Sequence, residues 1–206
     1  SMGRNRSRSG NMQIITIDFE TYYDKKYSLS KLTTEEYVRD ERFEVIGFCI
    51  KQGDGEEEWH TGGFENLKRI LLSYNWDESF CLAHNTMFDA AILSWKFGVR
   101  PRGWLDTLSM ARALHGTEVG GRLKKLSEFY NIGQKGTDVR LTKKLFELMS
   151  EGFPAIEFRL IDLTINMFAQ PVLELDLAVL ENHLENVVLH KEKLLESCVA
   201  DKETLM

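Results

Sequence analysis

Cysteine, proline and long hydrophobic runs are scarce in this chain of 206 residues, which has 3 cysteines and 3 prolines. The cysteines, Cys49, Cys81 and Cys198, are odd in number and far apart, so we expect structural thiols in a reducing compartment rather than disulfides or a zinc site. The longest stretch without a charged residue, 163–173, is shorter than the roughly 18 apolar residues that a membrane span needs. We therefore expect no membrane partner.

The overall composition is that of a folded soluble domain. Hydrophobic residues make up 43% of the chain and charged residues 28%, which excludes a disordered chain. Acidic residues outnumber basic ones by 32 to 26, and this excess argues against a protein that holds nucleic acid by bulk charge alone. It does not exclude a nuclease, whose metal site needs clustered carboxylates. Residues 1–11 are expected to be a flexible arm or an expression remnant.

Short β-prone runs come early in the chain and helical patterns come late. Strands are predicted at 12–17, 44–51, 57–61 and 79–83. Helices are predicted at 34–39, 66–74, 87–97, 105–114, 121–130, 139–149, 154–168 and 175–198. A helix that leads from one strand into the next is typical of an α/β sheet. We therefore expect an α/β fold with a mixed central sheet, flanking helices and a helical C-terminal extension.

Asp18 and Glu20 are the first candidate functional residues. They follow an apolar β-prone run at a spacing of two, so on an extended strand both side chains project from the same face. Two adjacent carboxylates repel each other unless a cation lies between them, and divalent metals such as Mg²⁺ take oxygen ligands. The alternative is that both are solvated residues at a strand end.

A second candidate acid is Asp89, which ends the segment His-Asn-Thr-Met-Phe-Asp at residues 84–89. This segment lies where a predicted strand gives way to a helix, and the carboxyl ends of strands are where open α/β sheets place ligands. The alternative is an acid that merely stabilises the helix N-terminus.

The third candidate is Asp138, which precedes a helical run. On a helix, Asp138 shares a face with Leu141, Thr142 and Leu145, the side that should pack inward. An acid that faces inward needs a partner, and a metal ion is one. The alternative is an ordinary Asp N-cap.

These acids and their local sequences together resemble the DEDD superfamily of 3′–5′ exonucleases. Ile-Thr-Ile-Asp-Phe-Glu-Thr at 15–21 is similar to the first motif, the segment 84–89 to the second, and Asp-Val-Arg-Leu-Thr at 138–142 to the end of the third. Residues 104–112 are similar to the strand–helix segment that follows the second motif. In particular, the chain looks like the proofreading exonuclease domain of family A, polymerase I-type DNA polymerases, with a phage-like character.

The resemblance implies an RNase H-like exonuclease domain over 12–170 and a polymerase-linker-like helical extension over 171–206. It also implies two divalent metal ions, Mg²⁺ or Mn²⁺, bound by the four acids. In that scheme Asp18, Glu20 and Asp138 hold the metal that activates the attacking water. Asp18 also reaches the second metal, which Asp89 supports.

Substrate contacts are implied by the same resemblance. Thr21 and Asn85 would touch the 3′-terminal nucleotide, and Phe19 and Phe88 would stack on or wedge against its base, unless these rings belong to the core. His84 belongs to the same expected set, although a packing role is the alternative for this histidine. The expected substrate-binding residues are Phe19, Thr21, His84, Asn85 and Phe88.

The resemblance implies removal of nucleotides from single-stranded or frayed DNA 3′ ends, with a polymerase domain as a partner in the parent protein. It places the chain in the cytoplasm of a bacterial or phage-infected cell. One alternative is an RNA-directed relative, such as an oligoribonuclease or an RNase D-like enzyme. A second is a catalytically impaired module that binds nucleic acid.

The chain departs from the family pattern just before Asp138. These exonucleases carry a Tyr four residues before the final Asp, or a His five before it, to orient the attacking water. Here those positions hold Gln134 and Gly133. Either the domain is impaired, or a segment is missing between Ile132 and Asp138, which predicts a break between Thr137 and Asp138.

Overall fold

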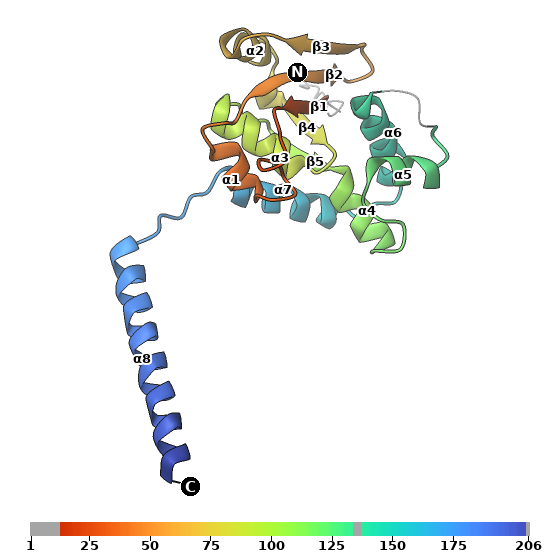
Figure 1. Ribbon diagram of the computed structural model, residues 1–206. Helices are drawn as coiled ribbons and strands as arrows, with labels where there is room; N and C mark the ends of the chain where they lie inside the picture. The colour runs from red at the N-terminus through yellow and green to blue at the C-terminus, as the bar shows by residue number, and fades with distance from the viewer. Residues whose placement is uncertain (1–12, 134–136, 205–206) are drawn as a thin grey trace, which may run out of the picture. The chain divides into compact units, whose positions relative to one another are not determined.

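The computed structural model describes residues 13–133 and 137–204, with side chains described through 197. Five strands form one mixed sheet in the order β3-β2-β1-β4-β5 (Figure 1). The strands are β1 (Gln13–Thr21), β2 (Val45–Gln52), β3 (Glu57–Thr61), β4 (Ser79–Ala83) and β5 (Gly103–Asp106). β1 runs antiparallel to β2 and parallel to β4, so the sheet changes from antiparallel to parallel pairing at its centre.

Helices cover both faces of this sheet. They are α1 (Thr34–Arg39), α2 (Phe64–Leu71), α3 (Thr86–Ala91), α4 (Thr107–His115), α5 (Leu123–Phe129), α6 (Asp138–Ser150), α7 (Ala155–Ala169) and α8 (Leu177–Thr204). A 3₁₀ turn, η1, spans Trp76–Glu78, and a π-helical turn, η2, spans Ile92–Lys96. α6 packs on β1, β2 and β4, and it also contacts α4 and α5. α3 packs on β1, β4 and β5 and contacts α1 and α7.

β1 is the centre of the hydrophobic core because it has a strand on each side and helices over each face. Ile15, Thr16 and Ile17 are therefore all buried. Alternate side chains point to opposite faces of a strand. Phe19 stacks on Phe97 beside α3 with ring centroids 5.9 Å apart, whereas Asp18 projects to the face that α6 covers.

The expected fold class is confirmed, and the predicted strands 57–61 and 79–83 agree with β3 and β4. The helix expected at 105–114 begins only at Thr107, because Leu105 and Asp106 pair with β4 as the end of β5. Asp18 and Glu20 lie inside β1 rather than after it. Pairing with β2 continues to Thr21, past a register shift between Glu20 and Thr21.

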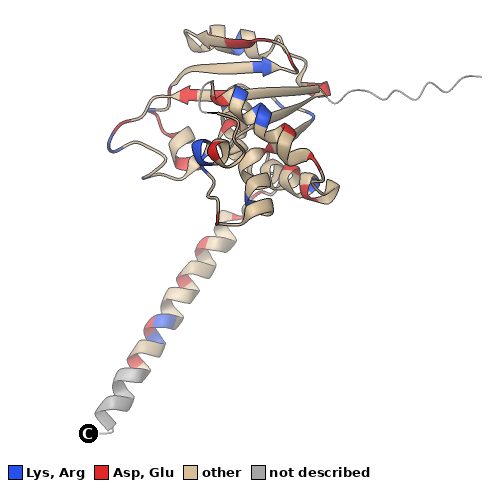
Figure 2. Cartoon of the chain, turned by 90° about the vertical axis from the view of Figure 1, so that its right-hand side faces the viewer, with Lys and Arg blue, Asp and Glu red and all other residues tan. Residues whose placement is uncertain are grey.

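The chain forms two units, one that ends at Pro171 and one that begins at Val172. The second unit contains α8, which carries acidic residues at intervals and, within 177–197, basic residues in one turn at Lys191 and Lys193 (Figure 2). In the described part of the chain, no helix is both long enough and apolar enough to cross a membrane. The arm expected at residues 1–11 lies outside the described residues.

The break expected between Thr137 and Asp138 is wrong. The side chain of Thr137 accepts a hydrogen bond from the Arg140 backbone N–H at 3.2 Å, and Thr137 is the N-cap of α6. The chain therefore runs directly from Thr137 into the helix that Asp138 begins. The rest of the expected omission falls on residues 134–136, which lie outside the described residues.

Candidate active site

The first two acids project from the carboxyl end of β1. Asp18 is half-buried and Glu20 is exposed, and the intervening Phe19 points into the core on the other face. Asp18 pairs in register with Cys49 of β2, whose buried thiol lies on the same face. The alternation of β1 thus brings two carboxylates to one face, as the sequence spacing predicts.

Asp89 reaches β1 from the first turn of α3. Its side chain is only 3% exposed, and its Oδ1 accepts a hydrogen bond from the Phe19 backbone N–H at 3.2 Å. Phe19 is the neighbour of Asp18 in the chain, so this bond fixes Asp89 next to the first motif. The geometry joins segments that are 70 residues apart in sequence.

Asp138 begins α6, and its side chain is exposed. α6 packs along the same face of β1 that carries Asp18 and Glu20. Asp138 therefore lies at the rim of the site, where its carboxylate can rotate. The sequence predicts an inward acid here, but Asp138 itself is exposed, whereas Val139, Leu141 and Leu145 of the same helix are buried.

The four acids form one electrostatic group. Burial, followed by repulsion from Asp138 and Glu20, raises the pKa of Asp18 to about 7. Burial, followed by repulsion from Asp18, raises the pKa of Asp89 well above its usual range. The carboxylates are thus close enough to oppose one another's ionisation, which is the condition that a divalent cation relieves.

The donor set matches a divalent metal in chemistry, because it consists of carboxylate oxygens in a group with excess negative charge. Across 13–133 and 137–197, no three His, Cys, Asp or Glu side chains form a group that could hold a metal ion as they lie. The exposed positions of Glu20 and Asp138 leave these two carboxylates room to turn towards Asp18. The residues therefore fit the cation by chemistry, and ligation would require this rearrangement.

Two of the expected substrate residues are engaged inside the protein. His84 Nε2 lies 2.8 Å from the Gly121 carbonyl oxygen, which can only accept, so Nε2 carries a proton. Its Nδ1 lies 2.8 Å from the Thr107 hydroxyl, and burial lowers the pKa of the ring. Thr21 Oγ1 is 2.8 Å from the hydroxyl of Tyr37, which itself donates to the Tyr22 carbonyl. The side chains of His84 and Thr21 thus form hydrogen bonds that hold neighbouring segments of the site together.

The two phenylalanines lie in different surroundings. Phe19 is 5% exposed and packs between Phe48 and Phe97, so its ring has the core position expected as the alternative to contact with a base. Phe88 is only partly buried and packs at the edge of the core near Tyr37. A ring at the edge retains a surface for a base, whereas a ring inside the core does not.

Asn85 lies in the turn between β4 and α3. It has a left-handed backbone with φ of 71°, which Asn tolerates better than most residues, and its side chain is exposed. The backbone N–H groups of Asn85 and Thr86 both donate to Asp106 Oδ1, at 2.8 and 3.2 Å. The side chain of Asn85 is therefore held at the surface by a fixed backbone.

Asp106 is a residue of the site that the sequence interpretation missed. Its buried carboxylate accepts hydrogen bonds from the turn at 85–86. The same carboxylate caps α4 by accepting from the backbone N–H groups of Leu108 and Ser109. One side chain thereby joins the second motif to the start of α4. The signal in the sequence is an Asp between an apolar strand and a helical run, a typical N-cap pattern.

The expected water-orienting positions contribute no side chain to the described site. Gly133 has none, and Gln134 lies outside the described residues. The nearest described tyrosine in sequence, Tyr130, has its hydroxyl 2.7 Å from His115 Nε2. This hydroxyl is thus already bonded within the protein.

The fold is similar to that of Brucella melitensis NrnC. The TM-score is 0.54 at 15% sequence identity, over 77% of this chain and 82% of NrnC. A structure of NrnC with bound Mg²⁺ gives a TM-score of 0.52 at the same identity and coverage. Escherichia coli RNase D, an exoribonuclease involved in structured RNA processing, gives 0.49 at 15% identity, over 78% of this chain and 46% of that one.

No protein-family model and no curated protein matches the sequence. At 15% identity, the likeness to NrnC shows a shared fold, in agreement with the RNase H-like class.

Proposed function

We propose that this chain is a DEDD-type 3′–5′ exonuclease that hydrolyses the terminal phosphodiester bond of DNA with two divalent metal ions, Mg²⁺ or Mn²⁺. The observation that carries the proposal is the position of Asp18, whose carboxyl group is half-buried and repelled by Glu20 and Asp138 while it opposes the ionisation of Asp89. A shared fold with NrnC, which has been solved with bound Mg²⁺, supports it.

The metal-holding residues would be Asp18, Glu20 and Asp138 for one ion, and Asp18 with Asp89 for the other. When bound, such ions lower the pKa of water and stabilise charge on the entering and leaving oxygens of an in-line displacement. The chain itself would provide the fixed half of the cradle through Asp89, which the Phe19 N–H holds in place. Glu20 and Asp138 would provide the adjustable half from the rim.

Asn85 and Phe88 are the proposed contacts to the 3′-terminal nucleotide. Asn85 has an exposed amide on a backbone fixed by Asp106, and Phe88 has a partly exposed ring. A ring can stack on any base, so this contact would bind frayed 3′ ends without selecting a sequence. Thr21 and His84 would act by holding these segments in place.

The proposed preference for DNA, and for a polymerase domain as partner, is supported by the sequence motifs at 15–21, 84–89 and 138–142. These resemble the editing domain of polymerase I-type enzymes. RNA-directed members share the same four acids, so a matched RNA substrate is the necessary comparison.

A cleavage assay with two labels tests the function. The protein is incubated with Mg²⁺ or Mn²⁺ and a single-stranded DNA oligonucleotide that is labelled at its 3′ or its 5′ end. We expect immediate release of the 3′ label as a mononucleotide and a gradual shortening of the 5′-labelled strand. EDTA should stop both reactions. An RNA oligonucleotide of the same sequence should be degraded more slowly, and a faster rate on RNA would contradict the preference for DNA.

Asp18→Asn is the decisive variant, and Asp77→Asn is its matched control on an exposed surface. Loss of a group that stabilises transition-state charge lowers rates by roughly 10²–10³-fold, so we expect at least this loss in Asp18→Asn and none in the control. Equal activity of Asp18→Asn and the parent would remove Asp18 from the mechanism.

A further inference from the structure

Glu57 begins β3 on the face of the sheet that α6 covers. Partners in an antiparallel pair have their side chains on the same face. Glu57 pairs with Lys51 of β2, and Lys51 pairs with Thr16 of β1. Asp18 is two residues beyond Thr16, so it shares this face. Glu57 thus lies two strands from Asp18 on the surface beneath α6.

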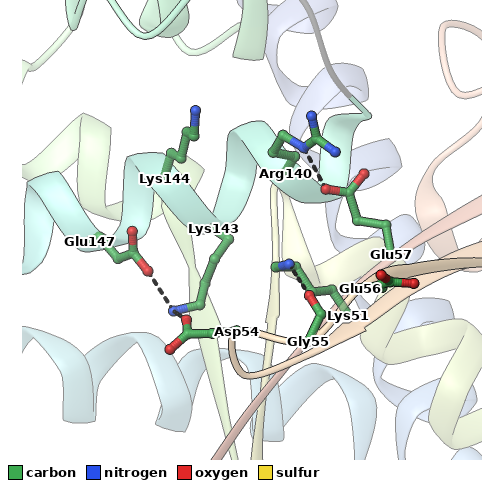
Figure 3. A pocket seen from close by; sticks show the side chains of 9 residues that line it. All are labelled: Lys51, Asp54, Gly55, Glu56, Glu57, Arg140, Lys143, Lys144 and Glu147. Atoms are coloured by element: carbon green, nitrogen blue, oxygen red, sulfur yellow. Dashed lines mark hydrogen bonds and ion pairs between the residues drawn. The ribbon is translucent and has the colours of Figure 1, made fainter.

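Both carboxylate oxygens of Glu57 bind the start of α6, and Figure 3 shows the contact with Arg140. Arg140 Nε donates to Oε1 at 2.6 Å in an ion pair, and Thr137 Oγ1 donates to Oε2 at 2.6 Å. The side chain of Glu57 is only 12% exposed, so water competes little for these bonds. Short hydrogen bonds to a charged group are the stronger class.

The ion pair is present at neutral pH. Burial alone would raise the pKa of Glu57, but the hydrogen bonds from Thr137 and Arg140 outweigh it and hold the pKa below its usual range. Glu57 is therefore ionised where a nuclease of this kind would work, and the contact to α6 does not depend on a proton.

Glu57 lines a cavity of about 730 Å³ between the β2–β3 turn and α6 (Figure 3). Basic and acidic side chains balance around it, so the cavity has no excess positive charge that would attract a phosphate. The lining charged residues are Lys51, Arg140, Lys143 and Lys144 with Asp54, Glu56, Glu57 and Glu147.

The bonds of the other charged residues around this cavity either lie within one element or join the β2–β3 turn to α6 over a longer distance. Lys143 Nζ is 2.7 Å from Glu147, which is on the same helix, and 3.8 Å from the fully exposed Asp54. Lys51 Nζ donates to the carbonyl of Gly55 within the β2–β3 turn. The short bonds of Glu57 therefore distinguish it from its charged neighbours.

We propose that Glu57 is a positioning residue, which holds the first turn of α6 and thereby keeps the backbone of Asp138 where its carboxylate can turn towards Asp18. Asp138 lies between Thr137 and Arg140, the two residues that Glu57 binds. Its own side chain is exposed, so the placement of this acid depends on the backbone that carries it. This inference rests on the proposed function, because it gives Asp138 a metal-binding role.

Glu57→Gln tests the inference, with Glu56→Gln as the matched control. Glu56 is adjacent, exposed and lines the same cavity, so the charge change is the same. Three experiments are made: amide hydrogen exchange of the first turn of α6 in the metal-free protein, calorimetry for the Mn²⁺ affinity, and steady-state kinetics for the kcat and KM of nucleotide release. Circular dichroism melting verifies that each variant folds.

We expect Glu57→Gln to exchange faster in this turn and to lose roughly 10-fold or more in Mn²⁺ affinity and kcat, with KM unchanged, as for other groups that orient a metal ligand. Glu56→Gln should match the parent. The reversed pair, Glu57→Arg with Arg140→Glu, should recover most of the loss because it restores the ion pair.

Parent-like exchange, Mn²⁺ affinity and kcat in Glu57→Gln would overturn the inference, as would an equal loss in Glu56→Gln or no recovery in the reversed pair. Failure of the proposed function is a separate result. If the parent protein neither binds Mn²⁺ nor releases nucleotides, the function is wrong, and so is the role of Glu57 in placing a metal ligand. The exchange data then still show whether Glu57 holds α6.

Discussion

Asp89 and Asp138 belong to the same group of acids, but the protein holds them in opposite ways. Asp89 is buried, and its carboxylate accepts a hydrogen bond from the central strand. Asp138 is exposed, and the turn that carries it is bound to the sheet by Glu57. One acid is placed by the core, and the other by a contact near the surface.

The difference has a physical cause. A buried carboxylate loses hydration, so it needs a hydrogen bond, a proton or a cation. An exposed carboxylate has no such requirement, but the surface does not fix its direction. The site therefore combines a rigid interior half, Asp18 and Asp89, with a rim half, Glu20 and Asp138, that is free to adjust.

The largest expected effect comes from neutralising the interior half. Asp89→Asn keeps the shape of the side chain and an oxygen that can accept from the Phe19 N–H, but it removes the charge. We expect nucleotide release to fall by roughly 10²–10³-fold. Without metal, resistance to urea should not fall, because the variant no longer buries an acid beside Asp18. Undiminished nucleotide release would show that the buried acid is only structural.

The pH dependence of the free energy of unfolding should report on Asp18, a member of the interior half, without any measurement of activity. The pKa of Asp18 is about 7 in the folded protein, above the roughly 3.9 of an unfolded Asp. Protonated Asp18 therefore favours the folded state, and this stabilisation is lost as the pH rises from about 4 to about 7. We expect a loss on the order of 2–4 kcal/mol in the metal-free protein.

Urea unfolding at a series of pH values in EDTA measures this loss. The Asp18→Asn variant should show a flatter profile over the same range, while Asp77→Asn should follow the parent. Saturating Mn²⁺ should also flatten the parent profile, because a bound cation favours the ionised acids. An Asp18→Asn profile that falls as steeply as that of the parent between pH 4 and 7 would contradict the crowding of these carboxylates.

The smallest expected effect compares the two phenylalanines of the motifs. Phe19→Leu should cost about 1–1.5 kcal/mol of unfolding free energy, because it changes the shape of a packed core position. Phe88→Leu should cost less, and it should raise KM for the oligonucleotide because a stacking surface is lost. Urea titration and steady-state kinetics of both variants measure this. A raised KM in Phe19→Leu with unchanged stability would show that Phe19 contacts the substrate.

Much of the local structure was predictable because it depends on neighbours in the chain. The apolar residues before Asp18 predict a buried strand, and the spacing of Asp18 and Glu20 predicts a shared face. The start of α1 at Thr34 follows from the capping box of Thr33 and Glu36, which is readable as a sequence pattern.

Other features were not predictable because they depend on pairing between distant segments. β5 has only four residues, and its strand character comes from the parallel pairing of Gly103 to Asp106 with β4. Burial of Phe19, and the internal bonds of His84 and Thr21, also required the tertiary structure. A motif states which residues are present, but not which way each side chain turns.

The sequence alone determined the order of strands and helices apart from β5, the alternation along β1 and the types of residue available for chemistry, because these depend on short spacings. Only the tertiary structure decided that Asp89 hydrogen-bonds to the strand of Asp18, that Asp106 joins the second motif to α4, and that Glu57 reaches α6. The last contact spans 80 residues. Such contacts arise when sheet pairing and helix packing bring distant segments together, and no local spacing encodes them.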